Sequence, residues 1–141
     1  MIAVISLIVV LLDQLSKYIV ISTIALNQSI PITSFFSITY ITNTGASFGS
    51  LQGLNALFII ISILFIGFII YFLQTFETKI LPALALVIGG AIGNLIDRIV
   101  YGHVIDFLHI KFWPVFNIAD SAITIAAIII IIQIFIFPSK E

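Results

Sequence analysis

The sequence predicts an all-α integral membrane protein with four transmembrane helices and a small β-containing loop outside the bilayer. The 141 residues are 62% hydrophobic and only 8% charged, with a mean hydropathy of +1.34. Such values are typical of membrane proteins rather than soluble enzymes. Four apolar runs are each close to the roughly 20 helical residues that cross about 30 Å of hydrocarbon. A short alternating segment lies between the first two runs.

The composition also excludes several classes of function. A net charge of −1, with only five scattered basic residues, leaves no electrostatic surface for nucleic acid, so no such partner is expected. The absence of cysteine excludes disulfides, cysteine nucleophiles and thiolate metal sites. The first apolar run carries Asp13 and Lys17 and lacks a basic leader and a small-residue cleavage site. We therefore expect a retained span rather than a removed signal peptide.

We place the four spans at residues 2–26, 54–73, 80–99 and 116–137 of a single membrane domain, residues 1–141. Four crossings bring both termini to one side of the membrane. The two longer connections, residues 27–53 and 100–115, then lie together on the opposite side.

The first span carries two charged residues within its apolar run. Asp13 and Lys17 are four residues apart, so they share a helix face and can pair inside the membrane. Each such group costs about 2.5–3.5 kcal/mol at the centre of a helix on insertion scales, and therefore needs an explanation. The spacing fits a neutralised structural pair and a part of a functional site equally well.

The first connection contains the predicted β-structure. From residue 36 to residue 40, apolar side chains alternate with serine and threonine, a period of two that predicts a half-buried strand. We expect this strand to lie at the membrane surface. Asn43 and Gly45 follow, and on their own they indicate an ordinary polar turn.

The second span is apolar except for Ser62 and is expected to be scaffold, whereas the third ends in polar residues. Gly89 and Gly93 form a small-xxx-small step that lets another helix approach closely. A stripe at i, i+4, i+7 and i+8 consists of Gly90, Asn94, Asp97 and Arg98. Because Asp97 directly precedes Arg98, we interpret the two as a charge pair that caps the span.

The fourth span opens with a matching polar stripe on one helix face, formed by Asn117, Asp120, Ser121 and Thr124. Asp120 lies near a helix N-terminus, where the dipole favours a carboxylate by about 0.3–1 kcal/mol. Capping explains one acid but not the whole stripe. Counting spans places several polar residues at one membrane face, opposite the termini: Asn43, Asp97, Arg98, Asp106, Asn117 and Asp120.

Carboxylates dominate this predicted site. His103 and His109 are the only histidines, so the usual zinc ligand sets are poorly supported. No phosphate-binding glycine loop accompanies the acids, and we expect neither a metal nor another cofactor. Two close carboxylates retain one proton and can together activate a water and polarise a scissile carbonyl. The same acids could instead relay protons in a transporter, and spacing does not favour Asp106 over Asp97.

Five motifs, in order, resemble those of the lipoprotein signal peptidase family, also called signal peptidase II. They are DQLSK at residues 13–17, NTGASFG at 43–49, GGAIGNLIDR at 89–98, VIDF at 104–107 and FNIADS at 116–121. The resemblance covers nearly the whole chain. It implies a bacterial intramembrane aspartyl peptidase of the cytoplasmic (inner) membrane, with cytoplasmic termini and with the β-containing loop and active site at the extracytoplasmic face.

Matched residue by residue, the resemblance implies that Asp106 and Asp120 are the catalytic pair. The residues that it implies for substrate binding or support of the site are Asn43, Gly45, Asn94, Asp97, Arg98, Asn117, Asp13 and Lys17. The implied substrate is a prolipoprotein whose lipobox cysteine carries a diacylglyceryl group, cut just before that cysteine. Membrane lipid is the other implied partner, and we expect a monomer.

Two other classes of function remain as alternatives. A small ion or proton transporter could use the same carboxylates, but it requires polar residues toward the terminal side, where the fourth span offers only Gln133. A non-catalytic scaffold leaves the convergence of two polar stripes unexplained.

Overall fold

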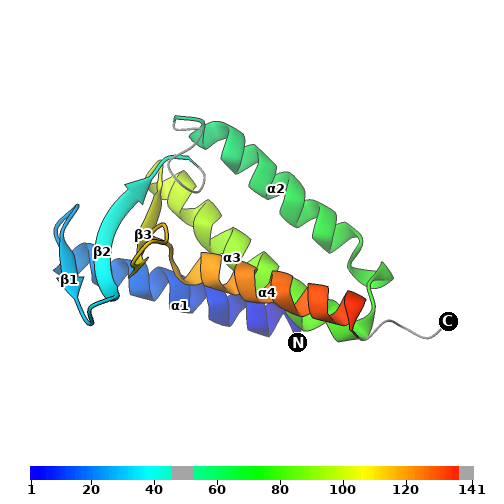
Figure 1. The fold of residues 1–141 in the computed structure, drawn as a ribbon. Helices are drawn as coiled ribbons and strands as arrows, with labels where there is room; N and C mark the ends of the chain where they lie inside the picture. The colour runs from blue at the N-terminus through cyan, green and yellow to red at the C-terminus, as the bar shows by residue number, and fades with distance from the viewer. Residues whose placement is uncertain (46–52, 137–141) are drawn as a thin grey trace.

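The computed structural model describes residues 1–45 and 53–136, which form a helical bundle with a small sheet at one end (Figure 1). The helices are α1 (Ile2–Thr23), α2 (Asn55–Tyr71), α3 (Leu81–Val100) and α4 (Ile118–Phe135). The strands are β1 (Ser29–Pro31), β2 (Phe36–Asn43) and β3 (Val104–Ile110), and the 3-10 turns Leu73–Thr75 and Thr78–Ile80 join α2 to α3. α1 begins and α4 ends at the end of the bundle away from the sheet (Figure 1).

Every predicted span and the predicted strand correspond to an observed element. The strand at residues 36–40 is confirmed and extends to Asn43. Residues 46–49 of the motif at residues 43–49, and the last residue of the predicted fourth span, lie outside the described residues.

Length separates α2 from the other helices. α1, α4 and the segment Thr78–Val100 are long and apolar enough to cross a membrane. α2 has 17 residues, about 25 Å at roughly 1.5 Å per residue, which is less than the hydrocarbon thickness of about 30 Å. The mostly helical membrane fold with a small sheet is confirmed, whereas the fourth crossing stays a prediction.

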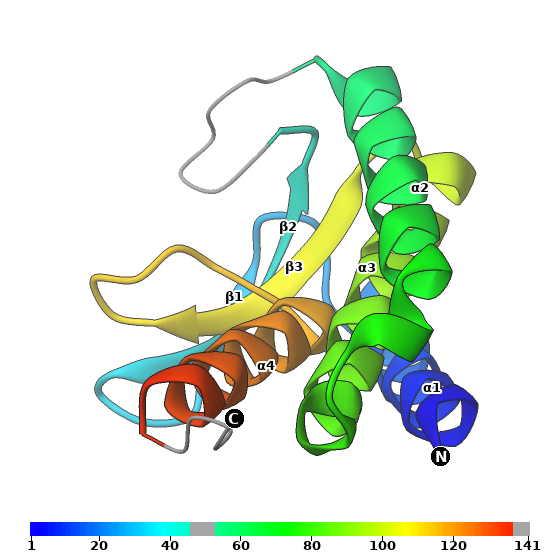
Figure 2. The ribbon, with the colours of Figure 1, turned by 90° about the vertical axis from the view of Figure 1, so that its right-hand side faces the viewer.

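α3 is the central helix, and it packs against α1, α2 and α4 (Figure 2). A Cβ on Gly89 would lie 2.8 Å from the Ser6 carbonyl oxygen of α1, and a Cβ on Gly90 would lie 2.5 Å from the Ala119 carbonyl oxygen of α4. A Cβ on Gly93 would meet a side-chain oxygen of Asp13 at 2.6 Å. Glycine is therefore required for these close helix approaches, as the small-xxx-small step predicts.

α2 contributes little to the interior. Ile69 is its one buried residue, and it joins a small apolar core of α3 and α4 residues that includes Leu84, Val87 and Ala126. The other faces of α2 are apolar and exposed, as expected for a helix that contacts lipid.

The sheet is antiparallel in the order β1-β2-β3. Its third strand comes from the second connection, for which the sequence analysis predicted no strand. Ile41 pairs with Asp106 and Asn43 with Val104, beyond an irregularity between Ile38 and Ile41. Residues two apart on paired strands share a face, so this register brings the side chain of Asn43 next to that of Asp106.

The glycine contacts predict a difference between two Gly→Ala variants. Gly89→Ala is expected to lower the free energy of unfolding by about 1–3 kcal/mol, because the added methyl overpacks the α1–α3 interface. Gly67→Ala should be neutral or stabilising, since a Cβ at Gly67 meets no atom within 4 Å. Thermal unfolding in detergent, followed through Trp113, the only tryptophan, measures both. Equal losses in the two variants would contradict the packing argument.

Candidate active site

A cleft of about 1380 Å³ opens beside the sheet, where α3 ends and α4 begins. Its walls come from β2, from β3 and the segment after it, from the first turns of α4 and from Phe58 of α2. The charged and amide side chains that line it are Asn43, Asn94, Arg98, Lys111, Asp106 and Asp120. The structure thus brings both predicted catalytic aspartates into one cavity.

Asp106 lies on β3 and is only 1% exposed. Its Oδ2 accepts a hydrogen bond from Asn43 Nδ2 at 3.1 Å, and its Oδ1 accepts one from Asn117 Nδ2 at 2.7 Å. Burial, and then the nearby charge of Asp120, raise the pKa of Asp106 to about 7, although the two amides and Lys17 oppose the shift. The Asp106 carboxyl group can therefore hold a proton near neutral pH.

Asp120 is held at the N-terminus of α4 by a capping box. Its backbone N–H donates to Asn117 Oδ1 at 2.9 Å, and its Oδ2 accepts from the Asn117 backbone N–H at 3.3 Å. The capping role expected from its position is therefore present. Its other oxygen, Oδ1, accepts from Asn94 Nδ2 at 2.8 Å, so the same carboxylate also belongs to the cleft.

Two asparagine amides connect the two aspartates. Asn117 Nδ2, which donates to Asp106, also lies 3.0 Å from Asn94 Oδ1 and 3.3 Å from the Ile105 carbonyl oxygen. Asn94 in turn donates to Asp120. Contacts among α3, β3 and α4 therefore fix the orientation of both carboxylates.

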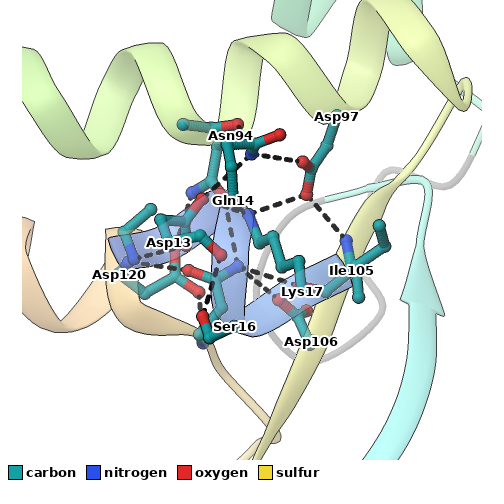
Figure 3. Close-up of polar contacts among 12 residues, drawn as sticks. Asp13, Gln14, Ser16, Lys17, Asn94, Asp97, Ile105, Asp106 and Asp120 are labelled. Atoms are coloured by element: carbon teal, nitrogen blue, oxygen red, sulfur yellow. Dashed lines mark hydrogen bonds and ion pairs between the residues drawn. The ribbon is translucent and has the colours of Figure 1, made fainter. Parts of the chain in front are cut away.

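A buried ion cluster of Asp13, Lys17 and Asp97 lies next to Asn94 (Figure 3). Lys17 is 2% exposed, and its Nζ lies 2.8 Å from Asp13 Oδ2, 2.7 Å from Asp97 Oδ2 and 3.2 Å from Asn94 Oδ1. The predicted pairing of Asp13 with Lys17 is present, but Asp97 shares the same ammonium group. Two hydrogen bonds through Asn94 link Lys17 of the cluster to Asp120.

Backbone and side-chain N–H groups also donate to the carboxylate oxygens of the cluster. The Ala119 backbone N–H donates to Asp13 Oδ1 at 2.9 Å, and the Ile105 backbone N–H donates to Asp97 Oδ2 at 3.0 Å. Gln14 Nε2 donates to Asp97 Oδ1 at 2.9 Å. Ala119 and Ile105 directly precede Asp120 and Asp106, so the cluster positions the backbone beside each candidate catalytic residue.

The predicted charge pair between Asp97 and Arg98 is wrong. Asp97 pairs with Lys17, whereas the Arg98 guanidinium contacts the carbonyl oxygens of Gly45 and Asn94 at 3.4 and 3.5 Å. It also lies 5.2 Å from the centre of the Phe58 ring. Neighbouring residues on a helix point in different directions, so Asp97 faces the interior and Arg98 faces the cleft.

Gln14 and Gly45 complete the polar contacts. Sequence reasoning did not single out Gln14, although a glutamine beside an aspartate in an apolar span was an available signal. The Gly45 backbone N–H donates to Asn43 Oδ1 at 3.0 Å, which orients the amide that contacts Asp106. In the described ranges, no three His, Asp or Glu side chains are arranged to hold a metal ion.

Comparison with known proteins defines the class of enzyme. Residues 5–136 match the family model for signal peptidase (SPase) II. The chain therefore belongs to the signal peptidase II family, a family of peptidases, as the sequence motifs predict.

Individual relatives agree with this assignment. The lipoprotein signal peptidase of Halothermothrix orenii is 44% identical over 137 residues, covering 95% of this chain and 94% of that protein. That of Moorella thermoacetica is 41% identical over 140 residues, covering 96% and 93%. A bacterial membrane enzyme solved by the in meso method at 2.3 Å resolution superposes with a TM-score of 0.89 at 35% identity, over 99% of this chain and 93% of that one.

The buried cluster predicts that Lys17→Met is strongly destabilising. The variant leaves Asp13 and Asp97 buried without their cation, and breaking a buried ion pair in this way costs about 3–5 kcal/mol. Lys79→Met is the matched control. It removes a pair with Glu77 at 3.1 Å near the surface, where such pairs contribute at most about 1 kcal/mol. Chemical unfolding in detergent compares the two, and similar losses would show that the cluster adds no special stability.

Proposed function

We propose that this protein is an aspartyl endopeptidase embedded in the bacterial inner membrane. It removes the signal peptide from diacylglyceryl-modified prolipoproteins by cutting just before the lipidated cysteine of the lipobox. Membership of the signal peptidase II family supports the reaction. The observation that carries the mechanism is that Asp106 and Asp120 line one cleft, each oriented by an asparagine amide.

The protonation state of the pair suits peptide hydrolysis. Because burial and the charge of Asp120 raise the pKa of Asp106 to about 7, the pair retains one proton at mildly acidic pH and begins to lose it near neutral pH. The two groups titrate as a unit, so the proton belongs to the pair. One carboxylate is then available as a base while the other carboxyl group acts as an acid.

Hydrolysis proceeds through a tetrahedral intermediate. The charged aspartate takes a proton from water as the water oxygen bonds to the scissile carbonyl carbon, and the protonated aspartate gives its proton to the carbonyl oxygen. The C–N bond of the resulting gem-diol then breaks. The first aspartate gives its new proton to the leaving nitrogen, and the second recovers a proton from a gem-diol hydroxyl. Both carboxyl groups return to their initial states.

The position and size of the cleft suit a substrate anchored in lipid. At about 1380 Å³ it is larger than the roughly 300–1,000 Å³ of a typical small-molecule site. Phe58 of α2 and Ile123 of α4 are among the residues that line it, so acyl chains can contact apolar side chains. The scissile bond, next to the lipidated cysteine, then reaches the aspartates at the membrane boundary, with most bulk water excluded.

The surrounding residues have supporting roles in this proposal. Asn43, Asn94 and Asn117 orient the carboxylates, and Gly45 fixes Asn43. Asp13, Lys17 and Asp97 hold the elements together, and Arg98 lines the cleft. The enzyme acts as a cofactor-free monomer, with cytoplasmic termini and the sheet at the extracytoplasmic face.

We expect Asp106→Asn and Asp120→Asn each to lower the cleavage rate by about 10²–10⁴-fold or more, because an amide cannot exchange the required protons. The measurement is a gel-shift assay in detergent micelles with a diacylglyceryl-modified prolipoprotein and a chelator present throughout. Glu77→Gln is the matched control, since it makes the same carboxylate-to-amide change at the other end of the bundle and should retain activity. Cleavage by Asp106→Asn at the wild-type rate would refute the catalytic assignment. A folded wild type without cleavage would instead favour a transporter, tested by proton flux in liposomes.

The raised pKa of Asp106 predicts an alkaline limit to activity. Cleavage should fall as pH rises through about 7, because the pair then loses its shared proton. Asn43 donates to the Asp106 carboxylate and stabilises its charged form, so Asn43→Ala should raise this pKa and move the alkaline limb to higher pH. In Asn55→Ala the limb should stay in place, since the Asn55 amide donates to the Arg98 carbonyl instead. Rate profiles between pH 5 and 9 test both variants. An alkaline limb at lower pH in Asn43→Ala than in the wild type would contradict the predicted rise in the pKa of Asp106.

A further inference from the structure

A second concavity, of about 480 Å³, lies on the sheet next to the catalytic cleft and shares Lys111 and Phe112 with it. Its lining includes hydroxyl, imidazole and ammonium groups and no carboxylate, and the residues that matter here are Ser29, Thr33, Ser37, His109, Lys111 and Phe112. These side chains offer hydrogen-bond donors and positive charge without a competing acid. Such a set suits an oxygen-rich anion.

Hydrogen bonds organise these donors. His109 Nδ1 lies 3.3 Å from Ser37 Oγ and 3.4 Å from Thr39 Oγ1. A hydroxyl that donates to Nδ1 leaves the ring hydrogen on Nε2, where it can donate to a ligand. Among the described residues Lys111 forms no ion pair, and its Nζ lies 5.3 Å from the centre of the Phe112 ring.

The turns that form this concavity project sideways from the bundle. Viewed along the helices, the β1–β2 turn and the segment between β3 and α4 both extend past α4 (Figure 2). The Lys111 backbone N–H donates to the Phe35 carbonyl oxygen at 2.9 Å and joins the two turns. Trp113 is four residues before Asn117, the cap of α4, so the chain holds it within about 14 Å of the start of that predicted span. If α4 crosses the membrane, these turns lie above the lipid next to it.

The exposed aromatic residues of these turns also favour a lipid as the ligand. Phe112 is 93% exposed and has a φ of 70°, a left-handed conformation that strains a bulky residue. Strain of this kind persists where it serves a function, and in water an exposed phenylalanine gives no packing energy in return. Phe35 and Trp113 are also largely exposed. At the membrane interface, aromatic side chains are favoured beside the headgroups.

We propose that this concavity binds the phosphate headgroup of an anionic phospholipid, with Lys111 and His109 as the donors and with Phe112 and Trp113 inserted beside it. The site would hold the sheet on the outer leaflet next to α4. A diacylglyceryl group carries no phosphate, so the ligand is a resident bilayer lipid rather than the substrate. The proposal goes beyond the peptidase function, and its test requires no cleavage.

Trp113, as the only tryptophan, is a built-in probe for the test. The full-length protein is placed in phosphatidylcholine nanodiscs that contain a small fraction of spin-labelled phosphatidylglycerol or equally spin-labelled phosphatidylcholine. The labelled phosphatidylglycerol should quench Trp113 fluorescence more strongly in the wild type. Lys111→Gln should reduce that preference by about fivefold, the effect expected for one lysine at an anionic surface. His109→Gln should also reduce the preference for phosphatidylglycerol.

Lys79→Gln is the matched control, since it removes a positive charge from the segment that joins α2 to α3 at the other end of the bundle, and it should keep the wild-type preference. Because Lys111 also lines the catalytic cleft and His109 does not, His109→Gln is the deciding variant. Equal quenching by the two lipids in the wild type, or an unchanged preference in His109→Gln, would overturn the proposal. Loss of the preference on adding inorganic phosphate, at an ionic strength matched with chloride, would also overturn it by assigning the site to free phosphate.

Discussion

The buried ammonium group of Lys17 is the interaction on which the rest of the site depends. A single buried charge costs several kcal/mol in a low-dielectric interior, and this one is stable only because Asp13 and Asp97 approach it within 2.8 Å. The two carboxylates in turn need donors, which the backbone N–H groups of Ile105 and Ala119 supply. One cation thus fixes α1, α3, β3 and α4 relative to one another. The backbones beside both candidate catalytic residues are part of that arrangement.

Neutral amides separate this ion cluster from the aspartate pair. Asn94 accepts from Lys17 on one side and donates to Asp120 on the other, and Asn117 lies between Asn94 and Asp106. An amide offers both a donor and an acceptor and adds no charge. It can therefore orient a carboxylate without imposing the strong pKa shift that a full charge at the same distance would cause. The ion cluster therefore holds the elements together, while the neutral amides of Asn94 and Asn117 contact the carboxylates of the candidate catalytic pair.

Local sequence patterns predicted the elements well but not the contacts between them. Hydropathy located the four helices, and alternation located β2. Counting spans placed Asp106 and Asp120 at the same end of the bundle. β3 was missed because Asp106 and His109 interrupt its apolar run and its first four residues are all buried, so no alternation appears. The predicted partner of Asp97 was wrong because its actual partner, Lys17, lies on another helix, 80 positions earlier. The preference for Asp106 over Asp97 came from family resemblance, since it depends on a cross-strand contact with Asn43 that spacing cannot reveal.

The shortness of α2 has a consequence for the bilayer itself. At about 25 Å for 17 residues, a crossing by α2 leaves a negative hydrophobic mismatch with hydrocarbon of about 30 Å, which bilayers relieve by thinning locally. α2 contributes Phe58 to the wall of the cleft, so the thinned lipid would lie at the entrance to the site. In the proposed reaction, such thinning would shorten the distance that a lipid-anchored peptide bond travels from the headgroup region to the aspartates. The length of α2, which has only one buried residue, would thus affect how easily a substrate reaches the cleft.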